Sequence, residues 1–284
     1  MKLANKIGLA SLLGSLGIAA LIGSLGYFQA RKALIDEEKH NLAALATAKK
    51  DALNNFFDDL RGSLGVVSRS PITLKALSEL QAAYASLPAE KAPPSDFLKG
   101  FYSELNAICK QNDSVGMALP TGRTLALQEQ YLPGAKADEN HPYFAAHQNA
   151  HGFFANLQAS LRLYDVFLIN PDGDIVYSFC KETDVGRNLR QDTQLKDTAL
   201  SAVFQSALGV SEEKFSDNDN QNQKIMKKST LLSDFAFYAP SKGGSAMFAA
   251  SPVLSRSNRN DPLSPSGAIY NAAPFYPSCP EDQS

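Results

Sequence analysis

The sequence predicts an α+β fold, in which helices come first and an antiparallel sheet follows. Two observations support this prediction. Apolar residues recur at helical spacing through residues 29–67, a stretch without proline, which is typical of a long helix. Later, runs rich in β-branched and aromatic residues are separated by turn residues, as in YDVFLI at 164–169 and DIVYSF at 174–179. We therefore expect a helical region over 29–137 and a sheet domain over 138–254.

An apolar segment near the N-terminus is long enough to cross a membrane. Residues 7–28 carry no charged side chain, and a helix of about 20 apolar residues spans a hydrocarbon core of about 30 Å. A cleaved signal peptide is the competing interpretation, because it also begins with basic residues followed by an apolar run. The length of the run and the helical pattern that continues beyond it favour an uncleaved anchor. Its glycines, spaced to let a second helix approach closely, suggest a homodimer: Gly14, Gly17, Gly23 and Gly26.

Breakers and capping residues divide the region that follows. Pro71 interrupts the long helix, and Ser70 or Thr73 can begin a second one that ends near Leu87. A third helix is predicted over 96–110. Glycine and proline in the polar sequence after it predict strands and turns.

Helical character returns over 138–161, ahead of the sheet. The residues between the first two strands, 170–173, read NPDG, which is typical of a hairpin turn. A helix is predicted over 198–208, and DFAFYAP at 234–240 and SAMFAASPVL at 245–254 are further strand candidates.

Charge and cysteine usage exclude several classes of protein. The net charge is −2 and the basic residues are scattered, which argues against nucleic acid as a partner. Cys109, Cys180 and Cys279 are far apart and lack CxxC spacing, so neither a zinc site nor a dense disulfide framework is expected. One bridge between Cys109 and Cys180 stays open, against buried free thiols.

Catalytic signatures are missing from the sequence. It contains no GxGxxG after a strand, no Walker loop and no GxSxG. We therefore expect a binding module that is not an enzyme and holds no cofactor. Asp172 and Asp174 are explained by the turn, where aspartate bonds the local backbone.

Several polar residues around the two central strands are candidates for binding a small ligand. A pocket between sheet and helices would need a few polar groups amid aromatic surface. The alternative for each tyrosine is core packing with its hydroxyl satisfied. The candidates are Tyr164, Asp165, Tyr177, Lys181, Asp184 and Tyr238, with Asp234 as a weaker one.

His147 and His151 are four residues apart on a predicted helix, a spacing that can hold a metal ion. Packing of the helix against the sheet is the simpler interpretation, and we expect no metal.

The run YDVFLINPDGDIVYSFCKETDVGRNL at 164–189 resembles the extracytoplasmic region of bacterial methyl-accepting chemotaxis proteins and of some membrane-bound adenylate or guanylate cyclases. The resemblance extends to YFAAHQNAH at 143–151, to the stretch at 234–253 and to the helical residues 52–80. These families carry PAS-like sensing domains of the Cache type.

The resemblance implies a single-pass protein of the bacterial inner membrane, with residues 1–6 in the cytoplasm and the bulk of the chain in the periplasm. It implies that a small molecule or a periplasmic binding protein is sensed, with chemotaxis as the first output. The sensing part of a membrane cyclase or histidine kinase is the alternative, as is a single-span scaffold protein without a ligand. A pocket lined by Tyr164, Tyr177 and Lys181 would favour sensing, and a filled interface between sheet and helices would favour the scaffold.

The chain departs from the family pattern in its last residues. Family members continue into a final strand, a second membrane helix and a signalling region. Residues 255–284 are instead crowded with proline and serine and lack a second apolar span. We therefore expect a disordered or frameshifted tail and a receptor truncated before its output. A sheet without its last strand would expose an edge and aggregate.

Overall fold

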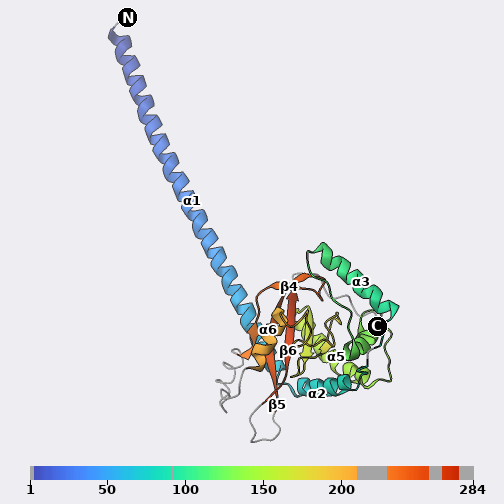
Figure 1. The fold of residues 1–284 in the computed structure, drawn as a ribbon. Coiled ribbons are helices and arrows are strands. Elements are labelled where there is room, and N and C mark those ends of the chain that lie inside the picture. The colour runs from blue at the N-terminus through green and yellow to red at the C-terminus, as the bar shows by residue number, and fades with distance from the viewer. Residues whose placement is uncertain (1–2, 91, 210–228, 256–263, 275–284) are drawn as a thin grey trace, which may run out of the picture. The chain divides into compact units, whose positions relative to one another are not determined.

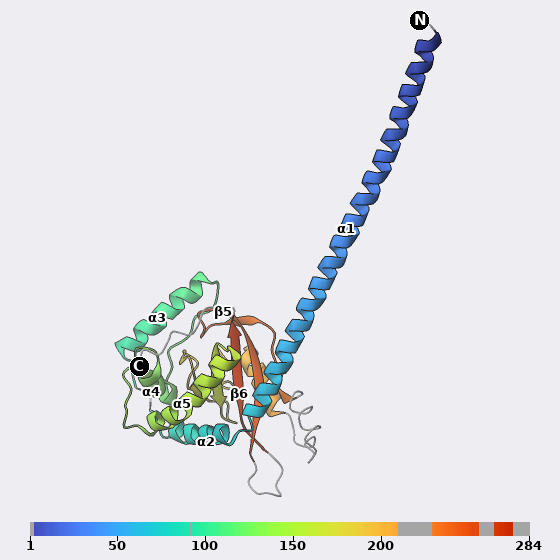
Figure 2. The same ribbon diagram turned by 180° about the vertical axis from the view of Figure 1, so that it is seen from behind.

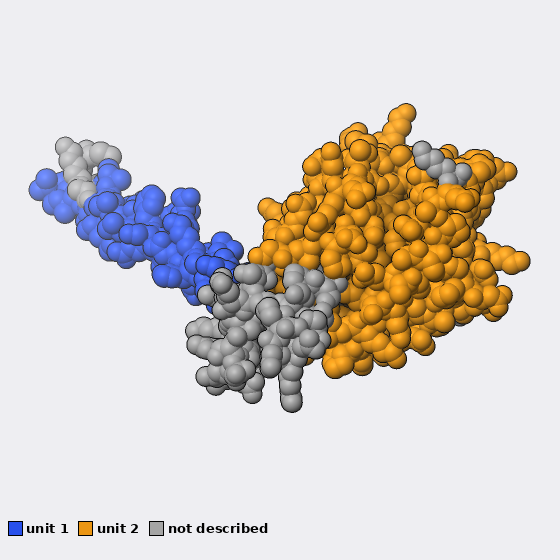
Figure 3. Space-filling model, turned by 60° about the horizontal axis from the view of Figure 1, so that its bottom comes forward, with its two compact units in different colours: residues 1–57 blue, residues 58–284 orange. Residues whose placement is uncertain are grey.

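The computed structural model describes residues 3–90, 92–209, 229–255 and 264–274. The chain divides into two compact units, residues 1–57 and 58–284 (Figure 3). Helix α1, Leu3–Val67, runs through the first unit and ends inside the second.

Helix α1 confirms the predicted apolar segment and the predicted long helix as one continuous element. Its apolar side chains near the N-terminus are exposed, with Leu16 at 64%. Exposure of this kind suits a lipid environment, in which leucine side chains face hydrocarbon. Among the described residues, α1 is the one helix with the length and hydropathy to cross a membrane. This is compatible with a single-pass membrane protein.

The other helices follow the capping signals in the sequence. They are α2 (Pro71–Ala85), α3 (Asp96–Gln111), α4 (Gly122–Tyr131), α5 (Pro142–Leu161) and α6 (Ala199–Leu208). Ser70 Oγ accepts the N–H of Ile72, and Pro71 occupies the first helical turn, where a missing N–H costs nothing. Ser95 caps α3 in the same way.

Helix α4 corrects the expectation of strand and turn structure in this part of the chain. Pro120 and Gly122 mark the entry into a helix rather than the end of a strand, and Gly122 has a φ of +60°. Leu125 and Leu127 are buried on this helix. Tertiary burial of a short apolar face therefore overrides a local sequence that looks like turns.

The sheet is six-stranded and every paired strand is antiparallel, which confirms the α+β class. The strands are β1 (Asp165–Ile169), β2 (Ile175–Ser178), β3 (Leu231–Leu232), β4 (Ala236–Tyr238), β5 (Gly244–Ser255) and β6 (Ser264–Pro274). The order is β2-β1-β6-β5-β3, and β4 also pairs with β5. The predicted hairpin is confirmed, since β1 pairs with β2 around a turn in which Gly173 has a φ of +99°.

Strand β6 corrects the expectation that the sheet lacks its last strand. It lies between β1 and β5 and pairs with both, so that Ile269 is opposite Leu168 on one side and Ser251 on the other. Its prolines, Pro265 and Pro274, are near its ends, where a missing N–H is tolerated. The central GAIYNAA is free of proline. The rest of the predicted tail, residues 256–263 and 275–284, lies outside the described residues.

Helices and sheet of the second unit share one core. Helices α2 and α5 pack against each other and against the sheet, while α6 packs on β5 and β6 (Figures 1 and 2). The last turns of α1 contribute Leu60 and Leu64, which are buried in this core. The end of α1 is therefore part of the domain.

Leu64→Ala should destabilise the second unit strongly, because Leu64 is 0% exposed and its removal leaves a cavity. We expect a loss of about 2–5 kcal/mol in the free energy of unfolding. Val66→Ala is the matched control, since Val66 is 63% exposed and should cost less than about 0.5 kcal/mol. Urea unfolding of the full chain in detergent micelles measures both. Equal losses would show that the end of α1 is not packed in the core.

Ile269→Pro should disrupt the sheet, because proline in a central strand removes a hydrogen-bond donor. We expect the chain to aggregate as the edges of β1 and β5 become exposed. Ile269→Val is the control and should stay monodisperse. The soluble fraction and the size-exclusion profile report the result, and a monodisperse Ile269→Pro chain would contradict the central place of β6.

Candidate functional site

The segment that follows β2 is held in place by side chains from the helices. Gln128 on α4 donates its side-chain N–H groups to the carbonyls of Thr183 and Val185, both at 2.9 Å. The hydroxyls of Tyr84 and Thr124 donate to the carbonyl of Gly186. These bonds fix the backbone of a loop that carries most of the polar groups of the site.

Gly186 is required by this close approach of loop and helix. It has a φ of +78°, and a Cβ there would lie 3.1 Å from Leu127 Cδ2 and 3.3 Å from the Cα of Thr124. A side chain would therefore be strained in its backbone and would push α4 away.

Asp165, the first residue of β1, is fully buried and clamps the end of β2. Its carboxylate accepts the backbone N–H groups of Val166, Phe179 and Cys180, and also the hydroxyl of Ser178 at 2.7 Å. Burial is compensated by these four donors. The Asp165 carboxylate thus links the start of β1 to the end of β2 and stabilises the hairpin.

Two further carboxyl groups lie beside Asp165 on the loop after β2. Glu182 accepts the hydroxyl of Tyr164 at 2.7 Å and the hydroxyl of Ser241 at 2.6 Å. Asp184 is buried and accepts the hydroxyl of Tyr238 at 2.8 Å through Oδ2, whereas its Oδ1 has no hydrogen-bond partner among the described residues. We call Asp165, Glu182 and Asp184 the acidic cluster.

Burial raises the pKa of every member of the acidic cluster. It raises the pKa of Glu182 to about 8, and the neighbouring charge of Asp184 adds to this effect. Burial and Asp184 likewise raise the pKa of Asp165 to about 7. Burial raises the pKa of Asp184 to about 6, against the hydrogen bond from Tyr238 and the nearby charge of Arg187. Burial and mutual repulsion therefore favour the protonated form of the carboxyl groups in the cluster.

A pocket of about 190 Å³ opens beside the acidic cluster. Its lining includes Glu182 and Thr183, which we call the floor of the pocket. Thr183 Oγ1 is buried without a hydrogen-bond partner among the described residues. Lys181, Lys242 and Glu104 add charge to the lining. The remaining lining residues are largely apolar and include Phe101, Leu105 and Ile108 of α3, together with Pro133, Tyr164, Cys180 and Pro240.

Five of the six predicted ligand residues lie at this pocket or directly behind it. Tyr164 and Lys181 line it. Lys181 has a φ of +53°, a backbone conformation that is uncommon outside glycine. Asp165, Asp184 and Tyr238 lie behind the lining as the buried part of the cluster and its hydroxyl donor. Their role in binding stays a prediction.

Tyr177 is not part of the pocket. It is fully buried, its hydroxyl lies 3.0 Å from His151 Nδ1, and its ring packs near Phe154. The interface between β2 and α5 is filled here, and the pocket that Tyr164 and Lys181 line among the described residues does not include Tyr177. His147 and His151 stack at 4.9 Å within the same aromatic packing. No group of three potential metal ligands occurs among the described residues.

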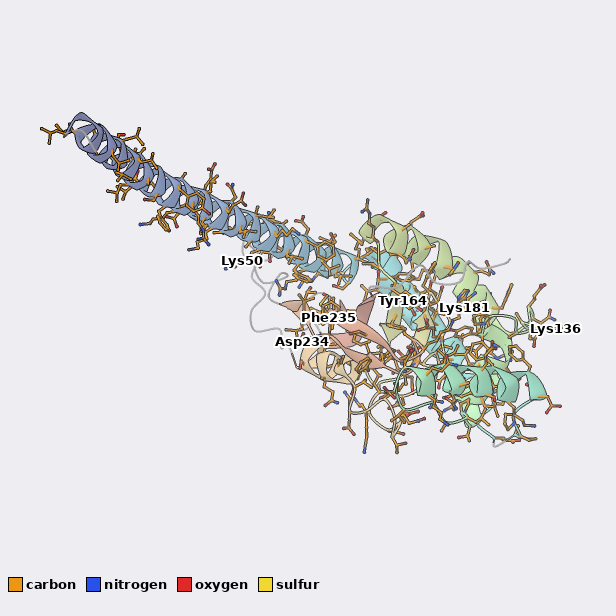
Figure 4. The ribbon with its side chains drawn as sticks, turned by 90° about the horizontal axis from the view of Figure 1, so that it is seen from above. Lys50, Lys136, Tyr164, Lys181, Asp234 and Phe235 are labelled. Atoms are coloured by element: carbon orange, nitrogen blue, oxygen red, sulfur yellow. The ribbon has the colours of Figure 1, made fainter. Side chains whose placement is uncertain are left out.

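The weaker candidates have local roles. Asp234 is exposed and its Oδ1 accepts the N–H of Phe235, and Figure 4 shows these two residues side by side, away from Lys181. Asp174 accepts the side-chain amides of Asn170 and Asn188, as expected for a residue that fixes a turn.

The bridge considered between Cys109 and Cys180 is absent. Cys109 is a free buried thiol, and Cys180 is disulfide-bonded, so Cys109 is not its partner.

Three further residues of the site were not among the candidates predicted from the sequence: Glu182, Thr183 and Ser241. Glu182 lies in CKETD, where it immediately precedes two residues of the site, so the acidic character of this short run was an available signal. Ser241 reaches the site from the turn between β4 and β5. No local pattern indicates that this turn meets the end of β2.

A wider groove of about 680 Å³ lies between the last turns of α1 and α5. It is lined mainly by apolar groups such as Val66, Phe153 and Leu157. None of its lining residues has an unsatisfied buried polar atom. The smaller pocket at the acidic cluster is therefore better suited to select a ligand by its polar groups.

Comparison with known proteins leaves the family of the chain open. No protein-family model matches it, and no curated protein matches it. Among solved structures, the sensor domain of the histidine kinase DctB from V. cholerae matches with 16% sequence identity and a TM-score of 0.28. This match covers 45% of the present chain and 38% of the DctB chain.

Glu182→Gln should change how stability depends on pH. A carboxyl whose pKa is raised to about 8 on folding binds its proton more tightly in the folded chain than in the unfolded one. Its stabilising contribution is present below the unfolded pKa and is lost as pH rises through the folded pKa. The unfolding free energy of the variant minus that of the wild type should therefore rise by more than about 1 kcal/mol as the pH is raised from about 5 to about 9.

Unfolding of the full chain in detergent micelles at a series of pH values measures this difference. Glu104→Gln is the control, since it removes the same charge at an exposed position. If the difference in unfolding free energy between Glu182→Gln and the wild type did not change with pH, burial would not raise the pKa of Glu182.

Proposed function

We propose that this chain is the ligand-sensing, extracytoplasmic part of a single-span membrane receptor and that the pocket at the acidic cluster receives the ligand. The proposal rests chiefly on the buried hydroxyl of Thr183, which lines the pocket and has no hydrogen-bond partner among the described residues, and on Asp184 Oδ1 behind it, which likewise has none there. Leaving buried polar groups without partners costs about 1–3 kcal/mol each. A ligand that supplied the missing donors would recover this free energy.

The composition of the pocket also supports binding of a small molecule. Apolar side chains of α3 form one wall and a few polar groups lie on the floor, which is the usual pattern in ligand sites. The volume of about 190 Å³ suits a compound of a few heavy atoms rather than a peptide or nucleotide.

Helix α1 offers a physical route for the signal. Its end is buried through Leu60 and Leu64, and the same helix includes the apolar membrane segment. A change in the packing of the domain around α1 would be carried along a continuous helix. Such a signal requires that the ligand binds one packing arrangement more tightly than the other.

The resemblance of residues 164–189 to chemoreceptor sensing regions supports a periplasmic location of this domain and a chemotaxis output, and the glycine spacing of the membrane segment supports a homodimer. A histidine kinase or cyclase output fits the same sensing part.

Ile108→Trp tests the pocket as the ligand site. Ile108 is half-buried on α3 and lines the pocket, so an indole there should fill it. A chemically mixed library of small solutes is screened by thermal shift on the full chain in detergent micelles. We expect at least one compound to raise Tm of the wild type and to leave Ile108→Trp unchanged.

Hydrogen exchange at residues 58–67 then tests sensing, since a sensed ligand should change protection of the end of α1. Ile72→Trp, an exposed site on α2, is the control and should respond like the wild type. A library without a hit, or a hit that stabilises Ile108→Trp equally, would contradict the proposal.

A further inference from the structure

We propose that the pocket selects ligands through a protonated primary amine on a short alkyl chain, with the ammonium group placed against Glu182 and Thr183 and with Asp184 buried behind them. This inference rests on the proposed function and names the class of ligand for the same pocket.

The hydrogen-bonding capacity of the floor favours a donor. Both oxygens of Glu182 accept from hydroxyls, and each carboxylate oxygen has room for a second donor. Thr183 Oγ1 and Asp184 Oδ1 have no partner among the described residues. An ammonium group has three donors and no acceptor, so it complements this set of oxygen atoms. A ligand carboxylate would meet a floor with the same charge.

The apolar wall distinguishes an organic cation from a metal ion. Within the described residues, no three acidic, histidine or cysteine side chains are placed to hold a metal. Phe101, Leu105 and Ile108 line the pocket above the floor. Such a wall gains free energy from burying methylene groups, at about 0.8 kcal/mol each. An alkylammonium ion presents its charge to the floor and its chain to the wall.

The charges at the rim limit what the other end of the ligand can carry. Lys181 and Lys242 line the pocket, with Glu104 as the opposing charge. Lys242 opposes a second ammonium group and favours either an uncharged chain end or a carboxylate. Simple alkylamines and ω-amino acids both carry the required amine. The affinity of the pocket for each compound shows which of the two classes it prefers.

Binding of an amine should change the protonation of Glu182. The groups that face Glu182 are Tyr164 before β1, Ser241 after β4, and Asp165, Asp184, Lys181 and Lys242 around the pocket. An ammonium ion bound there favours the ionised carboxylate and so lowers the raised pKa of Glu182. At neutral pH the proton of the Glu182 carboxyl is released to the buffer as the amine binds.

Calorimetric titration of the full chain in lipid nanodiscs tests this at pH 7 with butylamine, 5-aminopentanoate and 1,4-diaminobutane. Butanol and pentanoate are the matched probes without an amine. We expect butylamine or 5-aminopentanoate to bind, 1,4-diaminobutane to bind more weakly than the better of these, and the probes without an amine not to bind.

Glu182→Gln should weaken the binding amine by roughly ten- to a hundredfold, which is the range for a charge-assisted hydrogen bond. Glu139→Gln removes the same charge at an exposed position that does not line the pocket, and it should change affinity by less than about twofold.

Titrations in two buffers of different ionisation enthalpy measure the protons released, and this readout needs only the wild-type chain. We expect net proton release at pH 7. Binding of butanol as tightly as butylamine, unchanged affinity in Glu182→Gln, or an amine that binds without proton release would each overturn the inference. A neutral or anionic ligand that Ile108→Trp excludes would overturn the choice of amine and leave the sensing proposal intact. A pocket that binds no compound at all would contradict both.

Discussion

Two buried carboxyl groups, those of Asp165 and Asp184, and the half-buried carboxyl group of Glu182 beside them form the constraint on which the rest of this domain depends. Asp165 joins the start of β1 to the end of β2 through four hydrogen bonds. Asp184 and Glu182 tie the loop after β2 to Tyr238 and Ser241, which come from β4 and the turn that follows it. Neighbouring carboxylates in a poorly solvated site cannot all ionise cheaply. The fold therefore requires either bound protons or a compensating cation at this position.

The acidic cluster connects the fold to the proposed function because it lies between the protein interior and the pocket. Its inner members are satisfied mainly by protein groups, whereas Glu182 and Thr183 also line a pocket. The loop cannot easily move away from the cluster, since Gln128, Tyr84 and Thr124 hold its backbone from two helices. A site held this firmly keeps its unpartnered acceptors in place, so binding free energy is not spent on ordering the loop.

Periodicity in the sequence was enough to predict most elements, and contacts distant in sequence account for the failures. The long helix, the hairpin of β1 and β2 and the helix over 96–110 follow from local patterns, and all are present. Strand β6 was missed because a Pro- and Ser-rich composition hides a short proline-free run that only pairing with β1 and β5 turns into a strand. Tyr177 was assigned to the pocket because strand alternation does not say which face α5 covers. Ser241 reaches Glu182 across a separation of 59 residues, which no local pattern reports.

Infrared spectroscopy of the unliganded chain can detect a proton on the acidic cluster, because a protonated carboxyl has its own C=O stretching band. We expect this band to be present at pH 7, to disappear as the pH is raised above about 9, and to be reduced in Glu182→Gln. Absence of the band at pH 7 in the wild-type chain would mean that all three carboxyl groups are ionised there. That result would contradict the view that the cluster stores a proton in place of a cation.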